Sequence, residues 1–194
     1  MGNIEKRRSI RNFKNTKVES VVIKSVLQAG LQAPSPKNRQ PWRFVIISDE
    51  NKKKELVTSM RKYINMQIKE KSNREDIFAS LETMDIIEKA PVLILICYEC
   101  GMSEHHDDGV DWQISATDIE AVELQSIGAA VENMLLKAEE LGLGSLWCAD
   151  ILYAYDIVSK YSTRPVVSAV CLGYKNEMPK VKTKKKISEM CVFY

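Results

Sequence analysis

The spacing of apolar residues in the first third of the chain predicts a helix, a buried strand and a longer second helix. Apolar and small side chains recur every three or four residues after Val22, which is the period of an amphipathic helix. The spacing of Thr16–Glu19 fits a capping box that would begin this helix. The β-branched and aromatic run Arg43–Ser48 predicts a buried strand, and Asp49 is positioned to cap a charged helix that continues to about Lys71.

The rest of the chain mixes helical and strand patterns without regular strand–helix alternation. An amphipathic segment from about Arg74 to Lys89 precedes the apolar run Pro91–Tyr98, which predicts a central strand. Thr117–Glu120 fits a second capping box, and the strongest helical stripe of the chain follows it and closes at Gly142. The pattern also predicts strands at Ser145–Ala149 and Pro165–Tyr174, a short helix near Tyr155–Tyr161 and a loop at Glu99–Ala116. With no internal repeat or linker, residues 1–194 are predicted to form a single domain.

The charge balance excludes a generally basic surface. The chain has 28 Lys and Arg against 26 Asp and Glu, a net charge of +2. This balance argues against a general nucleic-acid binder, so any anion site must be local. The longest strongly apolar run, Val92–Cys97, is too short to span a bilayer, and the first residues lack the apolar stretch of a secretory signal. We therefore predict a cytoplasmic protein without membrane or nucleic-acid partners.

Five scattered cysteines indicate a reducing compartment. Cys97 and Cys100 form a CxxC, but a structural zinc site needs a second such pair or two histidines at metal spacing. The adjacent His105 and His106 do not have that spacing. A redox or metal role and a pair of buried thiols remain the two interpretations of the CxxC.

The stretch "RRSIRNF" is the first of three candidate anion-binding clusters. In an extended chain Arg7, Ser9 and Arg11 point to one side and Arg8 to the other. Two guanidinium groups and a hydroxyl suit a phosphate. The alternative is a solvated basic terminus.

The loop after Pro34 is the second cluster, and a lysine run near the end of the chain is the third. Ser35, Asn38, Arg39 and Gln40 offer hydrogen-bond donors and acceptors on a backbone stiffened by prolines, which suits recognition of a planar heterocycle at low entropic cost. The third cluster comprises Lys182, Lys184, Lys185 and Lys186. The alternatives are an ordinary turn for the loop and a solvated face for the lysines.

The known signatures of side-chain catalysis and nucleotide binding are absent. There is no P-loop and no GxSxG motif, and Gly142-Leu143-Gly144 lacks the third glycine of a dinucleotide fingerprint. Chemistry, if any, would therefore belong to a bound cofactor.

Taken together, four stretches resemble the FMN-dependent nitroreductase family. They are "RRSIRNF", "APSPKNRQPWRFVII", "AAVENMLLKAEELGLGSLW" and "LGYKNEMPKVKTKKKISEM", in the order and spacing of the family. The resemblance implies an α+β fold with a mixed β-sheet surrounded by helices, in an intertwined homodimer. It also implies one FMN per subunit at the dimer interface and NAD(P)H as reductant.

The resemblance assigns roles to particular residues. Arg7, Ser9 and Arg11, with Lys182 and Lys184, match the groups that hold the FMN phosphate. Ser35, Pro36, Asn38 and Gln40 match the family's loop that contacts the ribityl chain and the flavin ring. Trp147, Cys148 and Ala149 match the segment beside the reactive edge of the ring. The full set of expected cofactor-site residues is Arg7, Arg8, Ser9, Arg11, Pro34, Ser35, Pro36, Asn38, Gln40, Trp147, Cys148, Ala149, Lys182 and Lys184.

The implied reaction is reduction of small acceptors such as nitroaromatics or quinones by hydride transfer through flavin N5, with no catalytic side chain required. Trp112, in the aperiodic loop, is a candidate substrate-binding residue of a lid, with a core position as the alternative. A specialised flavin enzyme, such as a reductive dehalogenase or a flavin-destroying enzyme, is the runner-up. A non-enzymatic polyanion-binding module is the alternative from another class.

Overall fold

The centre of the molecule is a four-stranded sheet, seen in a computed structural model that describes residues 2–70, 75–99 and 116–194. The strands are β1 (Trp42–Ile47), β2 (Val92–Tyr98), β3 (Leu143–Cys148) and β4 (Val166–Tyr174). They lie in the order β1-β2-β4-β3, and neighbouring strands are antiparallel. A parallel pairing is contributed by an isolated bridge between Ser9 and Ser145 at the outer edge of β3. The predicted α+β fold is confirmed.

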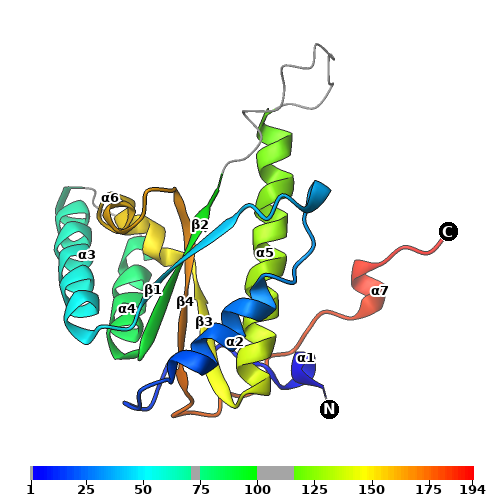
Figure 1. The fold of residues 1–194 in the computed structure, drawn as a ribbon, viewed down its shortest axis with the longest axis horizontal. Helices are drawn as coiled ribbons and strands as arrows, with labels where there is room; N and C mark the ends of the chain where they lie inside the picture. Colours follow the sequence, from blue (N-terminus) through cyan, green and yellow to red (C-terminus); the bar gives the residue numbers. More distant parts are fainter. Residues whose placement is uncertain (1, 71–74, 100–115) are drawn as a thin grey trace.

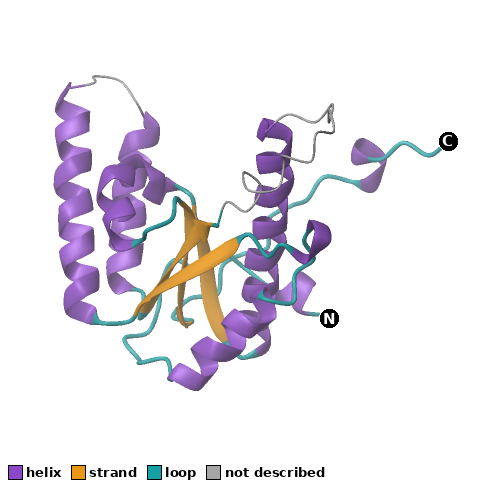
Figure 2. Ribbon diagram, turned by 45° about the horizontal axis from the view of Figure 1, so that its top comes forward, coloured by secondary structure: helices purple, strands orange, loops and turns teal. Residues whose placement is uncertain are grey.

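Helices cover both faces of this sheet (Figures 1 and 2). On one face lie α3 (Glu50–Glu70), α4 (Glu75–Lys89), η2 (Asp150–Ala154), α6 (Tyr155–Val158) and η3 (Ser159–Tyr161). On the other face lie α2 (Ser20–Gly30) and α5 (Ala116–Glu140), which pack against each other. Two apolar cores therefore flank the sheet, and α5 forms the long outer wall of one of them.

The position of β2 inside the sheet explains why its sequence does not alternate between apolar and polar residues. Every one of its residues is buried, because it is an inner strand with a core on each side. Leu93, Leu95 and Cys97 face the α3–α4 core, and the alternate residues face the α2–α5 core. The prediction of a buried central strand is confirmed.

Helix starts were predicted less well than strands. Asp49 caps α3 as expected, since its Oδ1 accepts a hydrogen bond of 2.8 Å from the backbone N–H of Lys52. Both predicted capping boxes were wrong. Helix α2 begins only at Ser20, because its N-cap residue Glu19 has extended dihedrals and Thr16–Val18 therefore precede the helix. Helix α5 begins at Ala116, so Thr117 lies within its first turn.

The two ends of the chain carry short helices that the pattern did not predict. Helix α1 (Asn3–Lys6) precedes the arginine stretch and packs near α5. Helix α7 (Ile187–Met190) lies in a terminal segment that extends away from the body of the chain (Figure 1). The apolar side chains of Val192 and Phe193 are exposed there.

Candidate functional site

The arginine stretch is anchored to the edge of β3 by Ile10. The backbone N–H of Ile10 donates a 2.9 Å hydrogen bond to the carbonyl of Ser145, and the Ile10 side chain is buried. It rests on Gly144, where an added Cβ would lie 2.9 Å from three Ile10 side-chain atoms. This close packing fixes the backbone on both sides of Ile10, and hence the positions of Ser9 and Arg11.

The first and third predicted clusters meet in one pocket of about 150 Å³. Its nine lining residues are Arg7, Arg8, Ser9, Arg11, Pro179, Lys180, Val181, Lys182 and Lys184. Six of the nine are cationic, so the pocket has a strong local preference for an anion although the chain is nearly neutral. Lys185 and Lys186, which the sequence grouped with the other lysines, do not line it.

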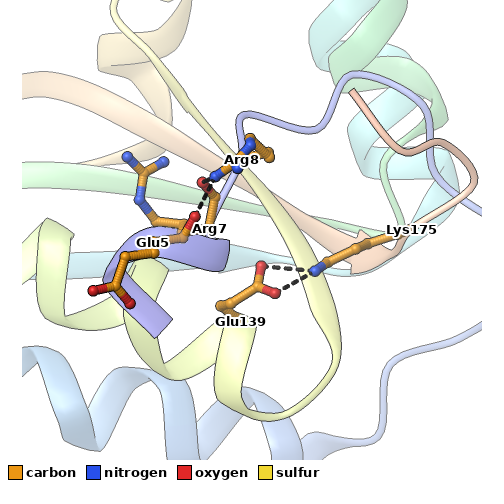
Figure 3. A network of polar contacts seen from close by, with 5 residues as sticks. All are labelled: Glu5, Arg7, Arg8, Glu139 and Lys175. Carbon is orange, nitrogen blue, oxygen red and sulfur yellow. Dashed lines mark hydrogen bonds and ion pairs between the residues drawn. The ribbon is translucent and has the colours of Figure 1, made fainter. Parts of the chain in front are cut away.

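The arginines of the pocket are only partly neutralised within the described residues. Arg7 Nε lies 3.3 Å from Glu132 Oε1, but this buried N–H has no partner with hydrogen-bond geometry. Arg8 Nη1 donates to the carbonyls of Glu5 and Arg7, at 2.6 and 2.7 Å (Figure 3). These carbonyls carry only partial charge, so most of the positive potential remains available to a ligand.

The position of Arg8 corrects the alternation argument. Strand-like alternation predicted that its side chain would point away from its neighbours, yet it lines the same pocket. The reason is that Arg7 is the C-cap residue of α1, so the extended backbone starts later than the sequence suggested. Arg8 folds back to hydrogen-bond the carbonyls at the end of that helical turn.

The donor set of this pocket fits a phosphate group. Three arginines, a serine and three lysines line a small volume. Guanidinium groups bind phosphate oxygens through paired hydrogen bonds, and a dianion would relieve the mutual repulsion of the cations. The pocket is too small to hold much more than such a group.

The second predicted cluster is a strained loop rather than an ordinary turn. Lys37, Asn38 and Gln40 have φ angles of 52°, 55° and 53°, in the left-handed region that side chains other than glycine rarely adopt. Such conformations cost on the order of 1 kcal/mol or more each, least for Asn. Ser35 holds the loop from inside, since its Oγ accepts a 2.9 Å hydrogen bond from the Gln40 N–H.

An ion pair ties the loop to α5. Arg39 Nη1 lies 3.6 Å from Oε1 of Glu123, whose side chain is 1% exposed. Glu123 Oε2 accepts a 2.5 Å hydrogen bond from the hydroxyl of Tyr98, at the end of β2. Sequence analysis did not identify Glu123. The available signal was a carboxylate on the buried stripe of α5, one turn before Ser126 and Ile127.

Within one chain the loop and the basic pocket lie on opposite sides of α5. The loop contacts this helix at Glu123, and the arginine stretch contacts it at Glu132. These two positions are separated by about 14 Å along the axis and by about two and a half turns. Half a turn places the two side chains on opposite faces. The structure thus joins the first and third clusters but leaves the loop apart from them.

The residues after Gly144 divide between the surface and the core. The side chain of Trp147 is 44% exposed, and its Nε1 donates a 2.9 Å hydrogen bond to Ser168 Oγ. Cys148 is buried, and its Sγ lies 3.7 Å from Sγ of Cys171. The hydrogen bond with Cys148 and burial raise the pKa of the Cys171 thiol well above its usual value. Cys148 therefore faces the α3–α4 core, and Ala149 is exposed beside it.

Several other candidates are settled or fall outside the described residues. Cys97 is buried, and burial raises its pKa, whereas Cys100 lies outside the described residues, as does Trp112. Among the residues described, no group of His, Cys, Asp and Glu side chains could hold a metal ion. None of the described helices has an apolar stretch that would cross a bilayer.

A larger pocket of about 590 Å³ lies beside the starts of α2 and α3 and contains none of the predicted site residues. Its charged lining residues are Lys17, Lys53, Lys89, Glu19, Glu50 and Glu88. The ammonium group of Lys53 donates to the carbonyl of Ala90 and so caps the end of α4. Because its charges balance, this pocket has no preference for an anion.

Comparison with known proteins places the chain in one family. Residues 4–174 match the sequence model of the nitroreductase family. The Bacillus subtilis (strain 168) protein named "Putative NAD(P)H nitroreductase YfhC" is 25% identical over 191 residues, which is 96% of this chain and 89% of that protein. A BluB-like flavoprotein from Clostridium difficile 630 has a TM-score of 0.76 and 27% identity, over 99% of this chain and 97% of that chain. The NADPH:FMN oxidoreductase of Vibrio harveyi, solved with NAD+, has a TM-score of 0.74 and 22% identity, over 98% of this chain and 75% of that one.

Proposed function

Because the chain belongs to the nitroreductase family, a family of flavin oxidoreductases, we propose that it binds FMN and uses NAD(P)H to reduce small oxidised acceptors such as nitroaromatics or quinones. The observation that carries this proposal is the small basic pocket built from the arginine stretch and the lysine tail. The named relatives include an NAD(P)H nitroreductase and an NADPH:FMN oxidoreductase. We also propose that residues 1–194 form one FMN-binding domain.

Each part of the site has a role in this proposal. Arg7, Arg11 and Lys182 hold the FMN phosphate by charge, and Ser9 donates or accepts a hydrogen bond there. The strained loop presents the polar groups of Asn38 and its neighbours to the ribityl chain and ring. The segment from Trp147 to Ala149 contributes its backbone beside the ring, since the Cys148 side chain is turned into the core.

The bound FMN would supply hydride acceptance and donation at its N5 atom. The protein's own groups would orient the ring, exclude water and stabilise negative charge through cations and amide donors. No side chain of the described site is needed as a nucleophile. The nicotinamide and the acceptor would bind in turn against the flavin ring, outside the phosphate pocket, which accords with the missing dinucleotide fingerprint.

We further propose that each site is shared between two copies of the chain. The proposal is supported by the contacts of α5, because within one chain the loop meets this helix at Glu123 and the arginine stretch meets it at Glu132, on the opposite face. An Arg11→Ala homodimer and an Asn38→Ala, Ser35→Ala homodimer would each bind FMN poorly. In a mixed dimer one site would collect all defects and the other would be intact.

Co-expressed and differently tagged chains test this arrangement. Heterodimers are expected to recover up to about half of the wild-type flavin loading. If both homodimers are defective, and the folded heterodimer also recovers no flavin, the shared site is wrong.

The test of the function itself begins with colour. The purified protein should carry the absorbance bands of FMN or acquire them when FMN is added. Oxidation of NADH and of NADPH should then be followed against a panel of nitroaromatics and quinones. A folded protein that does not take up FMN would overturn the proposal and favour the polyanion-binding alternative.

A specialised flavin enzyme is the second candidate. It is favoured by the likeness to the BluB-like flavoprotein, which spans nearly the whole of both chains. The two candidates differ in the fate of the cofactor. After aerobic reduction by NAD(P)H, the FMN absorbance should recover fully if the protein only reduces acceptors, and should be lost permanently if the flavin is consumed.

A further inference from the structure

The loop that carries Ser35, Asn38 and Gln40 is held in its strained conformation from outside as well as from inside. Its internal backbone donors are the Asn38 N–H to the Ser35 carbonyl, at 3.0 Å, the Arg39 N–H to the Pro36 carbonyl, at 3.1 Å, and the Gln40 N–H to Ser35 Oγ, at 2.9 Å. The side-chain amide of Gln40 also donates to the Asn38 carbonyl, at 3.3 Å. These bonds close the turn on itself but do not fix it to the rest of the molecule. The polar tie from this loop to another element is the pair formed by Arg39 and Glu123.

Glu123 occupies an unusual position for a carboxylate. Its side chain is almost fully buried in α5, and its Oε1 has no hydrogen-bond donor among the described residues. A buried carboxylate is costly unless its charge is paired and hydrogen-bonded. Tyr98 supplies the hydrogen bond to Oε2, and Arg39 supplies the compensating charge beside Oε1. Burial of the acid thus makes the position of Arg39 energetically important.

The three residues come from three elements that meet behind the loop. Tyr98 is the last residue of β2, and Glu123 is the eighth residue of α5. Arg39 lies between Asn38 and Gln40, which both have positive φ. Arg39 itself has right-handed helical dihedrals, and its side chain reaches from the loop to Glu123. An attraction along that direction resists relaxation of Asn38 and Gln40 to ordinary dihedrals.

We propose that Glu123 is a positioning residue, which holds the Ser35–Gln40 loop through Arg39 in the strained conformation that presents Asn38 and Gln40 to FMN. This inference rests on the proposed FMN function. The cofactor does not touch Glu123 in this scheme. The carboxylate acts by keeping the loop ready before the cofactor arrives, so that little ordering entropy is lost on binding.

The test uses Glu123→Gln, which preserves the shape of the side chain, together with Arg39→Gln and the double variant. The matched control is Glu139→Gln. Glu139 lies on the same helix, has an 11% exposed side chain and pairs with Lys175 at 2.7 Å, far from the loop (Figure 3).

The first readout is amide hydrogen exchange in the protein without FMN. The N–H groups of Asn38, Arg39 and Gln40 should exchange at least several times faster in Glu123→Gln and Arg39→Gln than in the wild type or in Glu139→Gln. The second readout is FMN affinity by fluorescence titration. Each single variant should weaken binding by roughly five- to tenfold, and the double variant by no more than the stronger single one, because both remove the same interaction.

The outcomes separate the two levels of the proposal. If the wild type does not bind FMN, the proposed function fails. If the wild type binds FMN but the loop exchange rates and affinities of the variants are unchanged, the positioning role of Glu123 is refuted. If Glu123→Gln does not fold, Arg39→Gln and Arg39→Lys still test whether the ion pair positions the loop, since Arg39 lies on the loop. Lysine keeps the charge, so it should restore part of the protection and affinity that Arg39→Gln loses.

Discussion

Replacing Gly144 by alanine should damage the phosphate pocket without touching any residue that lines it. An alanine Cβ would lie 2.9 Å from Cβ, Cγ1 and Cγ2 of Ile10, whereas carbon atoms in favourable contact are about 3.5–4.0 Å apart. Rotation of the Ile10 side chain does not relieve the overlap, because its Cβ is itself one of the three atoms. The segment Ser9–Arg11 must therefore move away from β3 by several tenths of an ångström.

By analogy with other overpacked cores, Gly144→Ala should lower the free energy of unfolding by about 1–3 kcal/mol. The same displacement stretches the hydrogen bond from the Ile10 N–H to the Ser145 carbonyl and shifts the donors of the pocket. If that full cost appears in phosphate binding, FMN affinity falls by roughly five- to 150-fold, since about 1.4 kcal/mol corresponds to a factor of ten.

Riboflavin, which lacks the phosphate, provides the specific assay. The FMN-to-riboflavin affinity ratio should fall in Gly144→Ala, measured by fluorescence titration alongside denaturant unfolding. Gly30→Ala is the control, because its Cβ would meet Met134 Cγ at 2.9 Å in the α2–α5 contact, away from the pocket. It should lower stability and leave the ratio unchanged. Lost stability in Gly144→Ala with an unchanged affinity ratio would refute the reasoning.

Three further predictions address the pocket, the fold and the tail. Arg11→Ala should weaken FMN binding about ten- to hundredfold, because a charge-assisted hydrogen bond contributes about 1.5–3 kcal/mol. Titration should show little change in riboflavin binding, and an unchanged FMN affinity would remove Arg11 from the site. The hydrogen bond from Arg43 and the nearby charge of Arg164 lower the pKa of Glu99. Its folded-state pKa lies below the unfolded value of about 4.3, so its stabilisation is present above that pH and is lost as the pH falls. Glu99→Gln should thus lower Tm at pH 7 by the equivalent of about 0.2–1 kcal/mol and less below about pH 4, and an equal effect at both would contradict this. Removing residues 191–194, whose side chains are exposed, should weaken the proposed dimer in sedimentation velocity, and unchanged assembly would show that the tail does not pack on a partner.

Strands β2 and β4 could be predicted because burial on two sides leaves a direct trace in the sequence. The run that became β2 is apolar at every position, and no helix among the described residues has that composition. The prediction of a buried strand at Arg43–Ser48 was wrong in its burial, because β1 is an edge strand in which Arg43 and Ile46 are exposed. Helix starts left a weaker trace. The spacing of Thr16–Glu19 fits a capping box, but the N-cap residue of α2 is Glu19, and Val18 before it is buried in contacts that depend on the tertiary fold.

The pocket residues likewise divide into those that neighbouring residues in the sequence identify and those whose role depends on contacts distant in the sequence. The close arginines and the lysine run each indicated a local anion site from the sequence, and the resemblance assigned both to one phosphate. The role of Gly144 was missed, since its neighbour Ile10 lies at the other end of the chain and the glycine pair was examined only as a nucleotide motif. Arg8 was misjudged because a single helical turn, α1, changes which residues alternate.

The pair Arg39–Glu123 explains why pieces of a site can be recognised before their arrangement can be derived. A strained loop keeps its conformation only if other groups hold it, and here the ion pair with Glu123 ties it to a helix remote in sequence. The same helix separates this loop from the basic pocket by about half a turn. Because Glu123 and Glu132 lie on opposite faces of that helix, a ligand that used both clusters of one chain would have to pass around it. The shared site proposed above avoids this, since a second copy would supply the loop beside the basic pocket of the first.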